Sequence, residues 1–74
     1  MENLIIMKIF GERLKELRLE KGYTQNQIAK ILNVSGNTIY AWENDKQEPS
    51  MHTLLNLSEI FNVSLDYLFG KSDF

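Results

Sequence analysis

The sequence contains no cysteine, one histidine and one proline among its 74 residues. A chain without cysteine cannot form a disulfide or a thiolate metal site. His52 is a lone imidazole, and neither a nucleophile nor an orienting partner for it is evident in the sequence. A Gly-rich phosphate loop is missing as well. These absences argue against an enzyme, and we expect no metal, no cofactor and no small-molecule ligand.

Long hydrophobic runs are also missing. No stretch approaches the roughly 20 apolar residues that a membrane-spanning helix needs. The apolar run over residues 4–10 is broken by Lys8 and lacks a small-residue cleavage site, so it does not resemble a signal peptide. The length suits one small domain, and a hydrophobic fraction of 43% is ordinary for a globular one. We therefore expect a cytoplasmic protein with no membrane partner.

Basic residues do not dominate the sequence: the chain has 8 Lys and Arg against 10 Asp and Glu, which gives a formal net charge of −2. On composition alone, this balance counts against nucleic-acid binding. The distribution of charge matters more than the sum, since several acidic residues fall on predicted helices outside residues 24–44. With few cations, one copy of the chain is expected to bind DNA with modest affinity, and a dimer would double the contacts.

Residues 24–44 predict two short helices joined by a tight turn. In the first helix, Ile28, Ala29 and Leu32 share one face of a 3.6-residue period. Two helices joined by so short a turn cannot lie antiparallel. They cross steeply, and the second helix is presented at the surface.

The ends of these two helices carry suitable capping residues. Thr24, with Gln27 three residues later, predicts a capping box at the start of the first helix. Asn33 tolerates the left-handed conformation that ends a helix, and Val34 fills the turn. Ser35 predicts the N-cap of the second helix.

The second helix separates into two faces at 100° per residue. Ile39 and Trp42 are apolar and must pack on another element, so we interpret Trp42 as a core residue and not as a base-stacking one. The opposite face is small and hydrogen-bonding, and it is expected to look outward. Its members are Asn37, Tyr40, Ala41 and Asn44.

Three further helices are predicted by apolar spacing over residues 10–21, 51–61 and 65–69. Gly22 and Asn62 suit the left-handed ends of the first two. With the two helices above, the chain is expected to be all-α, with five helices around one core. The predicted core residues are Leu14, Leu17, Ile28, Leu32, Ile39, Trp42, Leu54, Leu57 and Leu68.

Residues 24–44 resemble the helix-turn-helix of the phage Cro/repressor-type DNA-binding family. That motif has Gln first, Ala fifth, a small or left-handed residue ninth, and aliphatic or aromatic residues at later core positions. Asn33 stands where the family usually has Gly. The resemblance covers the chain from about Phe10 to Gly70, and it implies a compact, lambda-repressor-like DNA-binding domain. The matching residues are Gln25, Ala29, Asn33, Val34, Ile39 and Trp42.

The domain boundaries follow from the extent of this resemblance. Residues 10–70 form the expected helix-turn-helix domain, and residues 71–74 a frayed C-terminal tail. Residues 1–9 are rich in Ile, which favours either a short strand that pairs across a dimer or an N-terminal extension. It stays open whether the chain is full length or the DNA-binding part of a longer protein.

The resemblance implies a sequence-specific transcriptional regulator, a repressor, that reads operator half-sites in double-stranded DNA through the major groove. Asn37 suits adenine N6 and N7, and Ala41 suits a thymine methyl group. Gly36 has no side chain for reading, and it lets the backbone come close. The expected base-contacting residues are Gly36, Asn37, Tyr40 and Ala41. The expected phosphate-contacting residues are Thr24, Gln25, Ser35, Thr38, Asn44, Lys46 and Gln47.

The resemblance also implies a structural ion pair. In this family an Arg in the first helix pairs with a Glu near the end of the third, and Arg18 and Glu43 match those positions. Glu43 falls on the inward half of its helix, which favours the pair.

The implied partner is a palindromic operator bound by a homodimer. Aromatic and aliphatic residues near the two ends of the chain are candidates for the dimer interface: Ile5, Ile6, Tyr67, Phe69 and Phe74. The alternative is a protein-interaction module on the same scaffold, such as an antitoxin or an anti-repressor, which the acidic balance favours. Salt-dependent binding to a palindromic duplex discriminates between the two.

Overall fold

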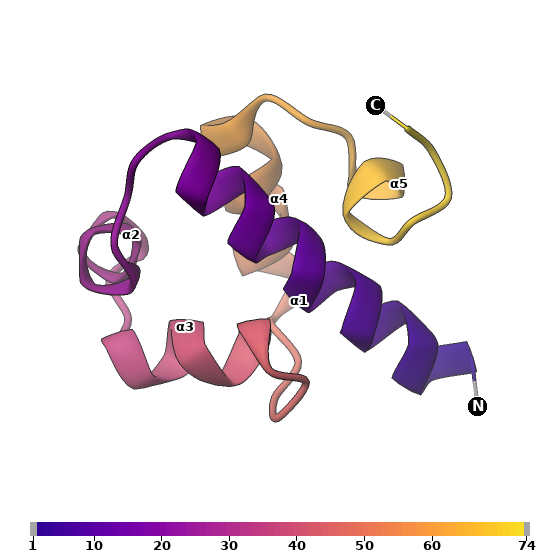
Figure 1. Ribbon diagram of the computed structural model, residues 1–74, viewed down its shortest axis with the longest axis horizontal. Helices are drawn as coiled ribbons and strands as arrows, with labels where there is room; N and C mark the ends of the chain where they lie inside the picture. Colours follow the sequence, from indigo (N-terminus) through magenta and orange to yellow (C-terminus); the bar gives the residue numbers. More distant parts are fainter. Residues whose placement is uncertain (1, 74) are drawn as a thin grey trace.

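The computed structural model describes residues 2–73, and side chains from residue 5 onward. Within that range the chain is all-α, with five helices: α1 (Glu2–Glu20), α2 (Gln25–Leu32), α3 (Gly36–Glu43), α4 (Met51–Phe61) and α5 (Leu65–Leu68). Figure 1 shows α1 crossing the molecule in front of α4, with α2 and α3 on one side and α5 on the other. Helix α1 contacts both α3 and α5, and α2 contacts α3. The predicted fold class is confirmed.

One core joins all five helices. Eight of the nine predicted core residues are buried, and Leu32 is half-buried and packs against them. The buried apolar residues are Phe10, Leu14, Leu17, Ile28, Ala29, Ile39, Trp42, Leu54, Leu57, Phe61 and Leu68.

The caps predicted at Thr24, Asn33, Ser35 and Asn62 are confirmed. The Thr24 hydroxyl accepts from Gln27 N, and the Gln27 side chain accepts from Thr24 N, which completes the capping box. Asn33 and Asn62 adopt left-handed conformations, with φ of 60° and 53°. These short-range contacts set where each helix begins and ends, and hence how α2 and α3 cross.

The first helix begins before its predicted start at residue 10, and the short-strand alternative for residues 1–9 is wrong over residues 2–9. The other alternative, an N-terminal extension to the domain, stays a prediction. Helix α1 begins at Glu2 and is continuous to Glu20; residue 1 lies outside the described range. The strand preference of Ile is worth at most about 1 kcal/mol and depends on context. Extending a helix that is already nucleated needs no new nucleus. The early turns also gain packing, since Ile6, Met7 and Ile9 are half-buried.

The described part of the C-terminal segment is held against α1, so the expected frayed tail is corrected. Arg13 Nη1 donates to the Tyr67 carbonyl at 2.9 Å and to the Ser72 carbonyl at 3.0 Å. The Arg13 guanidinium also lies 4.1 Å from the centre of the Tyr67 ring. Phe74 lies outside the described residues. Helix α5 ends at Leu68, one residue before the predicted end.

Helices α1 and α3 approach each other closely at Gly11. A Cβ atom added at Gly11 would lie 2.7 Å from the Trp42 carbonyl oxygen and 2.9 Å from that of Glu43. Both obstructing atoms belong to the α3 backbone, so no rotation of a side chain can make room. The absence of a side chain at Gly11 therefore sets the spacing between α1 and the C-terminal end of α3.

We expect Gly11→Ala to lower the free energy of unfolding by about 1–3 kcal/mol, because the methyl group must push α3 away. Alanine favours a helix by about 1 kcal/mol over glycine, so the steric effect must exceed this gain. Urea unfolding measures the difference. As a control, Glu12→Ala at the exposed neighbouring position should change stability by less than about 0.5 kcal/mol. A more stable Gly11→Ala protein would contradict this account.

Candidate DNA interface

Helix α3 presents a polar face to solvent and an apolar face to the core. Asn37 is exposed and Tyr40 is 53% exposed, whereas Ile39 and Trp42 are 0% and 3% exposed. Ala41, also predicted to look outward, is half-buried. The two-faced pattern predicted for this helix is confirmed, and Trp42 is a core residue.

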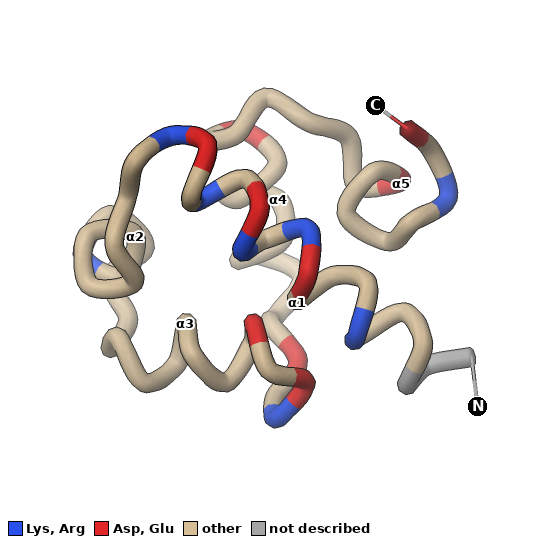
Figure 2. The backbone as a smooth tube through the Cα atoms, viewed as in Figure 1, with Lys and Arg blue, Asp and Glu red and all other residues tan. Residues whose placement is uncertain are grey.

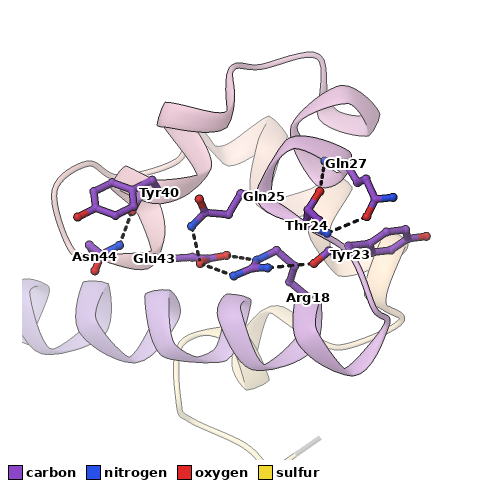
Figure 3. Close-up of polar contacts among 8 residues, drawn as sticks. All are labelled: Arg18, Tyr23, Thr24, Gln25, Gln27, Tyr40, Glu43 and Asn44. Atoms are coloured by element: carbon purple, nitrogen blue, oxygen red, sulfur yellow. Dashed lines mark hydrogen bonds and ion pairs between the residues drawn. The ribbon is translucent and has the colours of Figure 1, made fainter.

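Arg18 and Glu43 form a buried, bidentate ion pair between α1 and α3. Arg18 Nε lies 2.7 Å from Glu43 Oε2, and Nη2 lies 3.0 Å from Oε1. The side chains are 9% and 1% exposed. Arg18 Nη1 also donates to the Tyr23 carbonyl at 2.9 Å, just before α2 (Figure 3). The guanidinium thus fixes α3 and the α1–α2 connection at once.

Gln25 adds the second helix of the motif to this arrangement. Its Nε2 donates to Glu43 Oε1 at 3.1 Å, so one carboxylate joins residues from α1, α2 and α3 (Figure 3). An amide nitrogen carries two N–H groups, and the second can donate to a phosphate. Sequence reasoning placed Gln25 at a phosphate but missed its bond to Glu43. That bond depends on how α2 and α3 cross.

Several of the predicted phosphate-contacting residues cap helices. Thr24 caps α2, while the Ser35 hydroxyl accepts from Thr38 N and lies 3.0 Å from the Thr38 hydroxyl. Asn44 Nδ2 donates to the Tyr40 carbonyl at 2.9 Å (Figure 3). These bonds fix the side chains at the two ends of α3. They also use part of the hydrogen-bonding capacity that a phosphate would need.

Lys46 and Gln47 are exposed on the loop that follows α3. Asp45 precedes them in the left-handed conformation, with φ of 62°. Figure 2 shows that acidic residues flank the single cation of this loop. The structure therefore places Lys46 and Gln47 beyond the C-terminal end of α3, next to both positive and negative side chains.

The surface of the helix-turn-helix carries almost no exposed charge, in contrast to the rest of the chain. Within residues 24–44 the charged residues are Lys30 and Glu43, and Glu43 is buried against Arg18. Figure 2 shows α3 without a charged residue until its end. A net charge of −2 is therefore compatible with a surface that does not repel phosphates.

Asn26 is a residue of this surface that sequence reasoning missed. It is exposed near the start of α2, and its side chain lies against Gly36 at the start of α3. A Cβ atom added at Gly36 would overlap Asn26 Oδ1 and would lie 3.3 Å from Cγ. Gly36 was predicted to let the backbone come close, and in the structure a side chain from α2 lies over it. The base contact predicted for Gly36 stays a prediction. The glycine at the first position of α3, Gly36, was the sequence signal that could have indicated the role of Asn26.

None of the helices over residues 2–73 combines the length and the apolarity that crossing a membrane requires.

Comparison with known proteins identifies relatives of this arrangement. The chain is 48% identical over 63 residues to ImmR, an HTH-type transcriptional regulator of Bacillus subtilis (strain 168), covering 85% of this chain and 50% of ImmR. It therefore spans about half the length of that relative. The P22 c2 repressor, solved in complex with a synthetic operator, is 33% identical, with a TM-score of 0.78 over 85% of this chain and 96% of the repressor chain.

A second solved structure also has a similar fold. The restriction-modification controller protein C.AhdI from Aeromonas hydrophila has a TM-score of 0.80 and 25% identity, covering 93% of this chain and all of that one. A helix-turn-helix family model matches residues 14–68, which run from the buried Leu14 of α1 to the last residue of α5. The chain belongs to the Cro/C1-type helix-turn-helix family.

Proposed function

We propose that this protein is a cytoplasmic transcriptional repressor that binds palindromic operator DNA as a homodimer. Its relative ImmR is named as a transcriptional regulator, and the P22 c2 repressor was solved on an operator. In the proposed complex, α3 enters the major groove and α2 lies across the sugar-phosphate backbone.

The observation that carries the proposal is the exposed face of α3. Asn37 and Tyr40 project from a helix whose other face is fixed by the core and by the buried pair of Arg18 and Glu43. Exposed polar side chains on a rigid helix, with no exposed carboxylate beside them, suit the major groove, where base edges present donors and acceptors.

Each group on this surface has a distinct role. Asn37 donates to and accepts from one adenine edge, and Ala41 contacts a thymine methyl group. Tyr40 offers a hydroxyl to a base or to a phosphate. At the start of α2, the second N–H of Gln25 and the free backbone N–H groups bind a phosphate.

A homodimer is proposed because one small module makes few contacts with a duplex. Two copies related by a two-fold axis fit half-sites about 34 Å apart. Ile5 is 59% exposed, and it lines a shallow hollow with Ile6 and Phe69, which we favour for the dimer contact. Tyr67 is a weaker candidate, because Arg13 covers its ring.

Selection of bound duplexes from a random pool tests the proposal. We expect an enriched inverted repeat, and sedimentation should show two copies of the chain on it. Residues 24–47 expose two cations, Lys30 and Lys46, so a dimer neutralises at most four phosphates and the salt slope should be no steeper than about −4. No enriched sequence would favour the protein-interaction alternative, and a single copy on the duplex would refute the dimer.

Replacing Gln25 or Asn37 by Ala should produce two different patterns of loss. Gln25→Ala should weaken binding to all duplexes alike, with an unchanged salt slope because Gln25 carries no charge. Asn37→Ala should cost about 1–3 kcal/mol on the selected site and little on random DNA. Fluorescence anisotropy on both duplexes measures these losses. If Asn37→Ala weakened both by one factor, Asn37 would hold phosphate and not a base.

A further inference from the structure

The start of α3 lacks a side chain of its own, and α2 supplies one in its place. Gly36 is the first residue of α3, at the end that leads into the groove in the proposed complex. Oδ1 of Asn26 lies close enough to overlap a Cβ atom added at residue 36, and Cγ would lie 3.3 Å from that atom. The Asn26 amide therefore lies against the start of α3, beside the site of the missing side chain.

This amide also keeps its hydrogen-bonding capacity. The side chains of Gln25, Ser35 and Asn44 each form a hydrogen bond within the protein. Among residues 2–73 the Asn26 amide has no hydrogen-bond partner, and the residue is exposed. A carboxamide offers one acceptor and two donors, the combination that pairs with the N6 and N7 edge of adenine.

We propose that Asn26 is a specificity-determining residue that reads a base edge from the position left open by Gly36. This inference rests on the proposed DNA binding and adds a reading residue from outside α3. Because Gly36 directly precedes Asn37 along α3, the base pair read by Asn26 neighbours the one read by Asn37. The chemistry predicts an adenine at that position.

The test compares base preferences after selection from a random duplex pool. Asn26→Ala removes the amide. Gly36→Ala retains Asn26 but adds a methyl group that overlaps its side chain, so the amide must move. Both variants should lose discrimination at the same base pair, by about tenfold, and the double variant should lose no more than either one. Asn26→Gln retains a carboxamide and should keep part of the preference. Asn56→Ala on α4, also an amide truncation, is the matched control and should keep the full pattern.

The outcomes separate this inference from the proposed function. Loss of preference at one base pair, distinct from the one lost in Asn37→Ala, supports reading by Asn26. An equal loss on all duplexes with unchanged preferences would make Asn26 a backbone or packing residue, and no change would make it a bystander; both results overturn the inference while DNA binding stands. If the unsubstituted protein selects no sequence, the proposed function itself fails. Thermal unfolding of each variant verifies that it is folded.

Discussion

Replacing Trp42 by Ala is expected to remove most of the free energy of unfolding of the protein. Trp42 is 3% exposed and lies in the core beside Ile39, at the point where α3 packs on α1. Truncating a buried tryptophan costs about 3–5 kcal/mol. That loss is comparable to the whole free energy of unfolding of many small domains, about 5 kcal/mol. Circular dichroism in urea is the suitable measurement, because the only tryptophan fluorophore is removed.

A second substitution shows whether the loss comes from packing. Trp42 Nε1 is buried, and within the described residues it has no hydrogen-bond partner. Trp42→Phe keeps most of the aromatic surface and removes this unpaired donor, whose burial is itself unfavourable by about 1–3 kcal/mol. It should therefore destabilise the protein far less than Trp42→Ala. Equal losses in the two variants, or a stable Trp42→Ala protein, would contradict the core assignment.

Replacing Arg18 by Met is expected to lower the free energy of unfolding by about 3–5 kcal/mol. The substitution leaves the Glu43 carboxylate buried with only the Gln25 amide beside it, and it removes the bond to the Tyr23 carbonyl. An uncompensated buried charge is far more unfavourable than the loss of a surface ion pair, which is worth about 0–1 kcal/mol. Chemical denaturation of the variant measures the difference.

The double substitution Arg18→Met with Glu43→Leu provides the control. Replacing a buried ion pair by apolar residues of similar volume is often neutral, so the double variant should regain most of the lost stability. A double-mutant cycle then yields the coupling energy between the two positions. If the two single losses simply add, the pair does not act as a unit.

The five helices could be predicted from the sequence because their signals are local. A cap such as Thr24 or a left-handed Asn33 acts within three or four residues, and apolar spacing identifies the buried face. The N-terminal turns of α1 were missed because Ile-rich residues carry a strand preference that packing overrides. The hydrogen bond from Arg13 to the Ser72 carbonyl, which fixes the C-terminal segment, was missed because the two residues are 59 positions apart.

In the candidate interface, too, local features could be predicted from the sequence and contacts between helices could not. The exposure of Asn37 and Tyr40 follows from helical periodicity, and the pair of Arg18 and Glu43 follows from the family resemblance. The bond of Gln25 to Glu43 and the placement of Asn26 over Gly36 depend on the crossing of α2 and α3. No pattern along the chain specifies that crossing closely enough to position single side-chain atoms.

The close approach at Gly11 also limits how this sequence can vary. Most steric conflicts in a core can be relieved by shortening the opposing side chain, so a second substitution restores the fit. At Gly11 the opposing atoms are carbonyl oxygens, which every amino acid carries. Suppressors of Gly11→Ala should therefore be absent from the facing positions of α3. They should instead raise stability elsewhere in the domain or relocate α3 as a whole, which in the proposed complex would change the DNA sequence selected.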